Sequence, residues 1–387
     1  MPDTIAALGH EVLNVSPKTN WSFVSVRTGA GEVAWGEASL NAWEPMQRGA
    51  VELLAQRVCG LTVDQAREAL AVSPYSPGGL VHASAVSAVQ QALLELTSRA
   101  RGQAWSATLG GARRERLRAY ANINRATTER TPAGFVATAR RAAGCGFTAF
   151  KAAPFDGLTP ATCPTAEGRR RLHHGIDCML AIREAVGPDA RLMVDCHWRF
   201  DEPRALEALQ ALAPARLHWF ECPLPEMPMH WPALRRVRAA ARDRGVLLAA
   251  AETQVGVAGF EPLFEADLYD VVMPDVKYCG GPWEMLRIAE HARANGVQCS
   301  PHNPTGPIAS LHSLSVAAAA PWEAMVEIQF DESPLFDRLV PGAHPRLVDG
   351  AFGVATDATL QIAPDASLFR AHPYVPVPPG VEALAAG

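Results

Sequence analysis

Lysine is nearly absent from this sequence. Only three of its 35 basic Lys and Arg residues are lysines, and they stand at positions 18, 151 and 277. Genomic base composition can favour arginine, but arginine cannot transfer a proton near neutral pH, whereas lysine can. Each lysine that the sequence retains is therefore a candidate for a specific role.

Other absences narrow the class of protein. None of the eight cysteines forms a CxxC pair, which indicates reduced thiols in a cytoplasm rather than a disulfide framework. The first residues, MPDTIAALGHEV, lack a basic segment followed by an apolar one, and no apolar run is long enough to span a membrane. The net charge of −5 is too small to indicate a nucleic-acid partner. We expect a cytoplasmic globular protein that binds neither a membrane nor nucleic acid.

Two domains are expected for 387 residues of which 48% are apolar. Residues 1–115 have an α+β pattern, in which WSFVSVRT, GAGE and VAWGEA predict a hairpin at 21–38. Residues 116–349 repeat a strand–helix pattern and form the second expected domain. Residues 350–387 are too few for a domain, so we expect them to pack back on the first one. The helices expected in the first domain lie near 46–57, 63–72 and 82–101.

Eight short apolar strands follow one another in the second domain, with helical stretches between them. Their even spacing predicts a closed parallel α/β barrel. A doubly wound open sheet is the alternative, but no GxGxxG motif follows a strand. The expected strands are 117–124, 147–154, 191–198, 216–223, 246–253, 268–275, 297–304 and 324–330.

Ionisable residues stand at the ends of seven of these strands in a row. In VDCHWRF (194–200), Asp195 and His197 occupy alternate positions and therefore share one face of a strand end. The carboxyl ends of parallel barrel strands all meet at one face, which carries the active site in this architecture. The residues expected at this face are Lys151, Asp195, His197, Glu221, Glu252, Asp275, His302 and Glu327.

Three of these residues predict a metal site. Asp195, Glu221 and Glu252 end successive strands, and three converging carboxylates would repel one another unless a cation lay among them. An all-oxygen site without thiolates suits Mg²⁺, which keeps coordination positions open for a substrate. The alternative for each residue alone is a solvated acid at the end of a strand.

Two further strand ends predict an acid–base pair. Asp275 and His302 end adjacent strands, and a carboxylate bound to one imidazole nitrogen fixes the tautomer and stabilises the protonated ring. The other ring nitrogen then becomes a usable general base. A structural histidine is the alternative for His302.

The motifs VMPDVKYCGG, PHNPTGP and VEIQF, together with the three carboxylates, resemble the enolase superfamily and, within it, the mandelate racemase-like group. The segments WSFVSVRTGAGEVAWGEASL and LGGARRERLRAYA resemble that group's capping domain and its entry to the barrel. The resemblance implies a (β/α)7β-type modified TIM barrel with an N-terminal α+β capping domain that the C-terminal segment completes. It also implies a homo-oligomer, Mg²⁺ on the carboxylates and a small-molecule carboxylate substrate.

The same resemblance assigns roles to individual residues. His302 would remove the proton next to the substrate carboxylate, and Mg²⁺ and Lys151 would stabilise the resulting anion. Glu327 would hydrogen-bond the substrate or the metal-bound carboxylate, or would be a buried acid paired with an arginine. Capping loops near residues 18–21 and 40–43 would read the rest of the substrate. The weaker candidates for substrate contacts are Arg199, Asn20 and Trp21.

Two departures from the group's pattern favour one reaction. The group commonly carries Lys-x-Lys on its second barrel strand, but here the second position is Ala153, which cannot supply the second proton that racemisation needs. The Asp195-x-His197-x-Arg199 segment instead resembles that of acid-sugar dehydratases, in which the histidine protonates a leaving hydroxyl. We expect a Mg²⁺-dependent dehydratase that converts an aldonate or aldarate to a 2-keto-3-deoxy acid.

Several alternatives remain. An epimerase, a racemase or a cycloisomerase of a carboxylate or lactone could use the same fold. A barrel that only binds a carboxylate would not need the Asp275–His302 pair. A zinc hydrolase would carry a His-x-His early in the barrel, and the first strand, LRAYANIN, has none.

Overall fold

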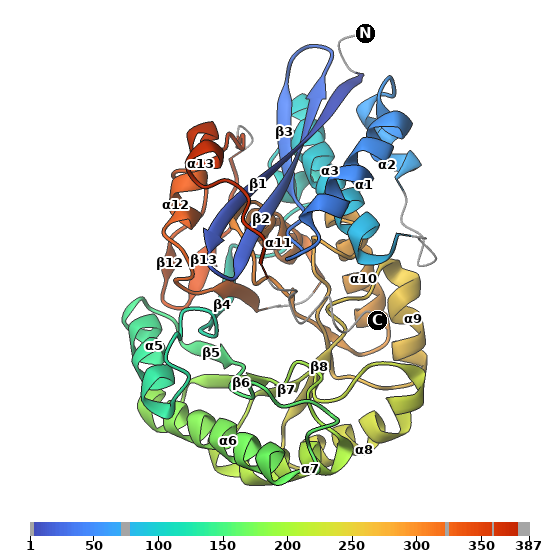
Figure 1. Ribbon diagram of the computed structural model, residues 1–387. Helices are drawn as coiled ribbons and strands as arrows, with labels where there is room; N and C mark the ends of the chain where they lie inside the picture. The colour runs from blue at the N-terminus through green and yellow to red at the C-terminus, as the bar shows by residue number, and fades with distance from the viewer. Residues whose placement is uncertain (1–3, 71–77, 322–324, 358–359, 378–387) are drawn as a thin grey trace.

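The computed structural model describes the chain except for residues 1–3, 71–77, 322–324, 358–359 and 378–387. A three-stranded sheet with its helices stands on one side of a larger barrel in Figure 1. We call the elements that precede strand β4 (Arg116–Asn122) the capping domain. The fold class predicted from the sequence is confirmed.

The capping domain is an antiparallel sheet covered by helices. The predicted hairpin is β2 (Thr19–Thr28) and β3 (Val33–Glu37), and β1 (Ile5–Ser16), which the sequence analysis missed, pairs with β2. Helix α3 (Gly79–Arg101) is buried along most of its length and packs on β3. The other helices before the barrel are α1 (Glu44–Val58), α2 (Val63–Ala69) and α4 (Trp105–Thr108).

All eight predicted barrel strands are present, although each is shorter than expected. They pair in parallel in the order in which they occur in the chain, from the first to the seventh. The eighth pairs in parallel with the first, which brings the two ends of the repeat together. The strands are β4 (Arg116–Asn122), β5 (Ala149–Ala152), β6 (Arg191–Asp195), β7 (Trp219–Glu221), β8 (Leu247–Ala250), β9 (Val271–Val272), β10 (Gln298–Cys299) and β11 (Val326–Gln329).

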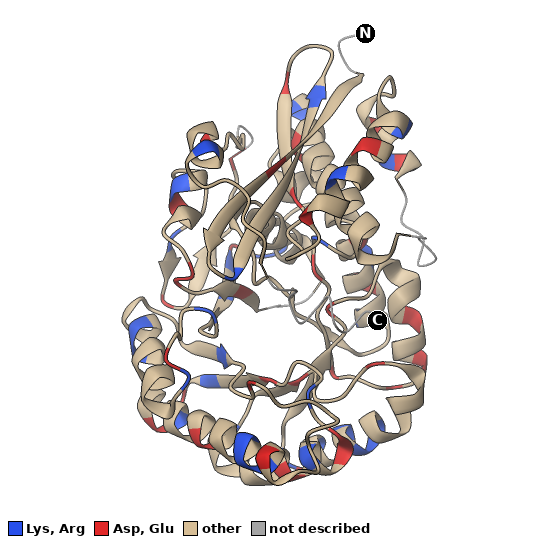
Figure 2. Cartoon of the chain, viewed as in Figure 1, with Lys and Arg blue, Asp and Glu red and all other residues tan. Residues whose placement is uncertain are grey.

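A helix lies in each connection between consecutive barrel strands, and these helices form the outer layer. Basic and acidic residues are interspersed along this layer in Figure 2. The connecting helices are α5 (Pro132–Gly144), α6 (Ala166–Val186), α7 (Glu202–Ala211), α8 (Trp231–Arg242), α9 (Gly256–Glu265), α10 (Pro282–Ala294) and α11 (Pro307–Ala319).

The barrel interior forms an apolar floor beneath the strand ends. Because side chains alternate along a strand, the residues two positions before the polar strand-end residues point into the barrel. Met193 lies two residues before Asp195, and Trp219 lies two residues before Glu221. This cluster of buried residues is Tyr120, Ala149, Met193, Trp219, Ala249, Val271, Met273 and Met325.

The C-terminal segment touches both parts of the molecule. After β11 come α12 (Leu335–Leu339), β12 (Leu347–Val348) and β13 (Ala351–Gly353), and β13 pairs antiparallel with β4. Helix α13 (Ala366–Ala371) packs on the capping sheet, where the rings of Phe369 and Phe23 lie 5.8 Å apart. The domain boundaries at residues 115 and 349 stay a prediction.

Two further observations bear on the chain as a whole. All eight cysteines are free thiols. Within the described ranges, none of the helices combines the length and the apolar character that crossing a membrane requires.

Candidate active site

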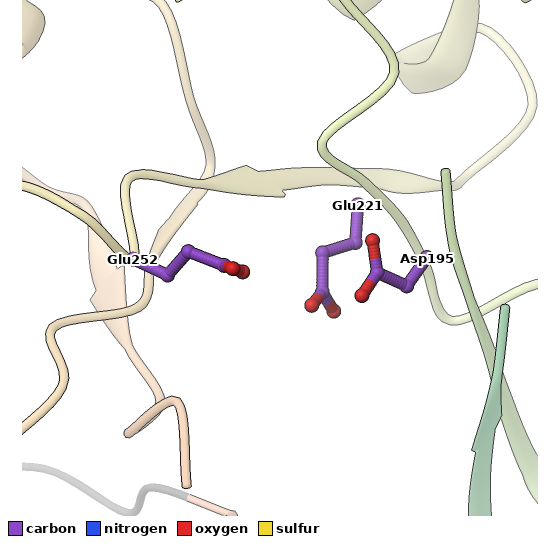
Figure 3. Close-up of side chains that lie close together, drawn as sticks. All are labelled: Asp195, Glu221 and Glu252. Atoms are coloured by element: carbon purple, nitrogen blue, oxygen red, sulfur yellow. The ribbon is translucent and has the colours of Figure 1, made fainter. Parts of the chain in front are cut away.

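Three carboxylates meet at the carboxyl ends of β6, β7 and β8. Asp195 and Glu221 are direct partners in the β6–β7 ladder, and Glu252 follows the end of β8. One oxygen from each carboxylate lies within 4.8 Å of those of the other two, and all three residues are buried. Figure 3 shows the side chain of Glu252 directed across the mouth toward Glu221 and Asp195. The strands therefore bring the three predicted metal ligands to one place.

Burial and neighbouring charges shift the pKa values of Glu221 and Asp195 in opposite directions. Burial, with added repulsion from Asp195 and Glu327, raises the pKa of Glu221 to about 8. Burial alone would also raise the pKa of Asp195, but His197 and Lys151 lower it instead. Oxygen-only carboxylate donors at this separation fit a hard divalent cation such as Mg²⁺.

The backbone turns sharply beside these carboxylates. His197 (φ 48°) and Trp198 (φ 55°) follow Asp195, Cys222 (φ 44°) follows Glu221, and Ala251 (φ 79°) precedes Glu252. Left-handed backbone costs a non-glycine residue roughly 1–2 kcal/mol. Such strain tends to gather at functional sites, where the surrounding structure holds it in place.

Lys151 lies inside the site and is paired with two acids. Its Nζ is 2.6 Å from Glu221 Oε1 and 2.9 Å from Glu327 Oε1, above the ring of Tyr120. Burial would lower the pKa of Lys151, but Glu221 and Glu327 raise it well above its ordinary value. Lys151 therefore presents a fixed positive charge rather than a proton-transfer group.

His302 stands between Asp275 and the carboxylate cluster. Its Nδ1 lies 2.8 Å from Asp275 Oδ2, and its Nε2 lies 3.5 Å from Glu252 Oε1. Lys277 Nζ contacts the same Asp275 oxygen at 2.5 Å, and the Lys277 amide donates to Asp275 Oδ1. Burial would raise the pKa of Asp275, but Lys277 and His302 lower it.

Glu327 connects β11 to the loop that carries His302. It accepts hydrogen bonds from Asn122 Nδ2 at 2.7 Å and from the Asn303 amide at 2.9 Å. Its charged partner is Lys151 rather than the arginine of the alternative interpretation. Burial would raise the pKa of Glu327, but Lys151 and His302 lower it.

His197 lies at the other end of the carboxylate cluster. Its Nε2 is 2.9 Å from Asp195 Oδ2, and its amide donates to Asp195 Oδ1. The side chain is 16% exposed, so it lies at the rim of the site.

The three predicted substrate-contact residues all have protein partners. Arg199 Nη1 donates to the Phe155 carbonyl at 2.6 Å. Asn20 is fully buried and donates to Val375 O and Glu44 Oε1. Trp21 is buried and packs edge-on against Phe336. A substrate contact for Arg199, Asn20 or Trp21 stays a prediction.

Sequence reasoning missed several residues that support the site. Trp219 Nε1 donates to Glu221 Oε2 at 2.7 Å, and the two-residue spacing of Trp219 and Glu221 on one strand could have indicated this contact. Glu226 accepts from Trp198 Nε1 and from the Ala251 amide, and so ties together the turns after β6 and β8. No spacing rule indicates the roles of Glu226 and Asn303, because the contacts that define those roles join different βα units of the barrel.

Comparison with known proteins identifies the family. The family model described as "Enolase C-terminal domain-like" matches residues 134–365. The chain belongs to the enolase superfamily. This match confirms the predicted resemblance. It also confirms that the protein belongs to a family of enzymes, some of whose members are named dehydratases.

Individual relatives of this superfamily are similar over most of the chain. A D-galactonate dehydratase of Klebsiella pneumoniae (strain 342) is 28% identical over 300 residues, which cover 76% of this chain and 75% of the relative. A D-galactonate dehydratase family member of Streptomyces bingchenggensis (strain BCW-1) is 30% identical and covers 84% of this chain and 83% of its own.

A solved structure shows the shared fold. The protein comes from Burkholderia xenovorans strain LB400, is provisionally named an L-alanine-DL-glutamate epimerase, and is bound to magnesium and fumarate. It superposes with a TM-score of 0.84 over 98% of each chain at 23% identity. At this identity the likeness establishes the fold and not the reaction.

Proposed function

We propose that this protein is a Mg²⁺-dependent dehydratase of a sugar acid, an aldonate or an aldarate. The observation that carries the proposal is the position of two histidines at opposite ends of one carboxylate cluster. His302 contacts Glu252 on the β8 side, and His197 contacts Asp195 on the β6 side. Dehydration needs a base for one proton and an acid for the leaving hydroxyl, and this arrangement supplies both.

The metal site is assigned to Asp195, Glu221 and Glu252, whose buried oxygens have the right chemistry and separation. Bound Mg²⁺ would supply positive charge for a substrate carboxylate and for the negative charge that develops beside it. Lys151, fixed between Glu221 and Glu327, would add a second positive charge at the same place.

The proton transfers are assigned to the histidines. Asp275 accepts the hydrogen bond of His302 Nδ1–H, so that Nε2 carries a lone pair and can take the proton from C2. His197 would give a proton to the 3-hydroxyl, which leaves as water when the C3–O bond breaks. The resulting C2–C3 enol would take up a proton at C3 and become a 2-keto-3-deoxy acid.

The substrate class draws support from a relative named D-galactonate dehydratase and from another named as a member of the D-galactonate dehydratase family, which match 76% and 84% of this chain. Epimerisation would need a second proton donor opposite His302. Ala153, at the position where the group commonly has lysine, is buried and offers only its carbonyl, which Arg130 Nη2 contacts. Lys151 is held by two carboxylates, and Lys277 is bound to Asp275. Dehydration therefore fits this chain better than epimerisation.

A substrate screen tests this proposal. The Mg²⁺-loaded protein is incubated with aldonic and aldaric acids, D-galactonate among them, and a carbonyl reagent detects the 2-keto product. The expected result is turnover of one acid or a small stereochemical group, which His302→Asn abolishes together with exchange of the C2 proton in deuterium oxide. Exchange without any keto product would overturn dehydration in favour of epimerisation or cycloisomerisation.

A further inference from the structure

We propose that Glu37 of the capping domain is a positioning residue for the base His302. This inference rests on the proposed function, because it gives His302 the role of proton acceptor. The capping domain would then not only cover the mouth of the barrel but also hold the loop that positions His302.

Glu37 reaches from the end of β3 to the loop that follows His302. Its carboxylate is fully buried and accepts hydrogen bonds from Thr305 Oγ1 at 2.5 Å, the Gly306 amide at 2.8 Å and the Ala309 amide at 3.0 Å. Ser39 Oγ, from the capping domain, donates to the same carboxylate. All but one of these donors belong to the barrel segment 305–309.

The segment 305–309 leads into α11 and includes the start of its first turn, and no side chain at the N-cap position caps this helix. Its N-cap residue is Gly306, which carries no side chain, and Pro307 follows it. The first amides of a helix need acceptors, and a negative charge there also interacts favourably with the helix dipole. Glu37 supplies both functions from another domain.

The absence of a side chain at Gly306 lets the Glu37 carboxylate lie close to the backbone at the start of α11. A Cβ atom on Gly306 would lie 2.9–3.0 Å from both carboxylate oxygens of Glu37 and 3.0 Å from the Trp21 ring. A side chain at position 306 would therefore crowd both Glu37 and Trp21 of the capping domain.

His302 lies just before the segment 305–309 that Glu37 holds, and the residue next to it, Asn303, is held by Glu327. Asn303, the next residue, donates its amide to Glu327 Oε2 and its side chain to the Glu327 carbonyl. Ser313 Oγ of α11 donates to Asn303 Oδ1 at 3.0 Å. A shift of α11 would therefore be passed to Asn303 and to the backbone of His302.

Glu37 is itself held rigidly by α3. Gln91 of α3 accepts from the Glu37 amide at 3.0 Å and donates to its carbonyl at 2.9 Å. At Gly36 the two elements are so close that an added Cβ would lie 1.9 Å from the Ala88 carbonyl oxygen.

The same helix also holds the loop that follows Asp275. Gln91 Nε2 lies 3.4 Å from the Val276 carbonyl, and Ser87 Oγ accepts from the Gly280 amide at 2.9 Å. Strand β3 therefore contacts the loop that follows His302, and helix α3 contacts the loop that follows Asp275. Because the base works only when these two side chains stay aligned, the capping domain fixes their relative position.

The first test compares two buried acids of the capping domain. Glu37→Gln keeps the size of the side chain but removes its charge and presents an amide group to the α11 amides. The expected effect is a fall in kcat of roughly 10- to 100-fold, with KM and Mg²⁺ affinity within about threefold of wild type, because a small displacement of a base mainly affects the chemical step.

The matched control is Glu95→Gln. Glu95 is equally buried, lies on α3, and pairs with Arg99 and the Ile362 amide rather than with the barrel. We expect kcat of this variant within about twofold of wild type. A loss of kcat equal to that of Glu37→Gln would overturn the specific role of Glu37.

The second test uses Thr305. Thr305→Val removes one donor to Glu37 and is expected to lower kcat several-fold, whereas Thr305→Ser keeps the hydroxyl and restores it. If Thr305→Val and Thr305→Ser behave alike, or if the effects of Glu37→Gln and Thr305→Val simply add, the residues do not act through one contact.

A third measurement needs no substrate and therefore separates this inference from the proposed function. Amide hydrogen exchange of peptides spanning 303–309 is expected to speed up at least tenfold in Glu37→Gln and to stay at the wild-type rate in Glu95→Gln. Unchanged exchange in Glu37→Gln overturns the positioning role whatever the reaction. Faster exchange in a protein that dehydrates no sugar acid would contradict only the proposed function.

Discussion

Lys277 Nζ and His302 Nδ1 contact the same oxygen of Asp275, at 2.5 and 2.8 Å. A carboxylate that is shared in this way cannot rotate without losing one of its two partners. The geometry therefore makes Lys277 part of the mounting of the base, although its amino group lies against Asp275 and not against the carboxylate cluster.

Replacing Lys277 tests this relationship. Lys277→Met is expected to lower kcat roughly 10-fold or more while KM and Mg²⁺ affinity stay near wild type, because Asp275 loses the contact that fixes its orientation. The value of kcat from steady-state kinetics and the rate of C2 proton exchange in deuterium oxide should decrease together. Lys277→Arg should recover part of the activity, and a Met variant with wild-type exchange would contradict the prediction.

Mg²⁺ should stabilise the folded protein through the carboxylate cluster. A ligand at 100 times its Kd adds about 2.7 kcal/mol to the free energy of unfolding. We expect Mg²⁺ to raise the midpoint temperature of thermal unfolding and a chelator to return it to its original value. Glu252→Gln should lose most of the shift, while Glu95→Gln should keep it; an equal shift in both variants would place the metal elsewhere.

His197 should affect elimination more than proton removal. His197→Asn is expected to lower the rate of keto-acid formation roughly 100-fold, which is within the usual range for loss of a general acid. Exchange of the C2 proton, measured by NMR in deuterium oxide, should continue because His302 is intact. Parallel loss of both signals would instead mean that His197 acts by holding Asp195.

The buried His312 should make the folded protein less stable in acid, because burial disfavours the protonated form of its ring. It lies in α11, fully buried, with its ring stacked on Trp105 at 4.2 Å, and burial lowers its pKa from 6.5 to about 3. Since the unfolded chain binds the proton first, this stabilisation is complete above pH 6.5 and is lost as the pH falls toward 3. At pH 5 the loss is about 2 kcal/mol.

His312→Phe keeps the stacked ring but cannot titrate. Denaturant unfolding at pH 7 and pH 5 should show a smaller decrease in the free energy of unfolding for this variant than for wild type. Identical decreases in the two proteins would show that other groups govern the acid transition.

Much of the site follows from one periodicity in the sequence. Because Asp195, Glu221 and Glu252 end strands that repeat at one βα unit, a parallel barrel must bring them to the same face. The pairing of Asp275 with His302 follows from the same argument, since their strands are neighbours.

Other features could not be predicted because they depend on contacts between distant segments. The barrel partners of the Glu37 carboxylate lie more than 260 residues away along the chain. Asn20 is a residue type that suits a substrate-binding loop. In the structure, however, its side-chain amide donates hydrogen bonds to Glu44 of the capping domain and to the Val375 carbonyl. β1 was missed because IAALGHEVLNVS alternates too weakly to distinguish a strand from sequence alone.

The left-handed turns beside the carboxylates have a consequence for protein engineering. Ala251 would lose roughly 1–2 kcal/mol of backbone strain if glycine replaced it, so a search for heat-tolerant variants would favour that change. The added backbone freedom would loosen Glu252, which follows directly in the chain. Replacing Ala251 with glycine should therefore raise thermal tolerance and lower turnover at the same time.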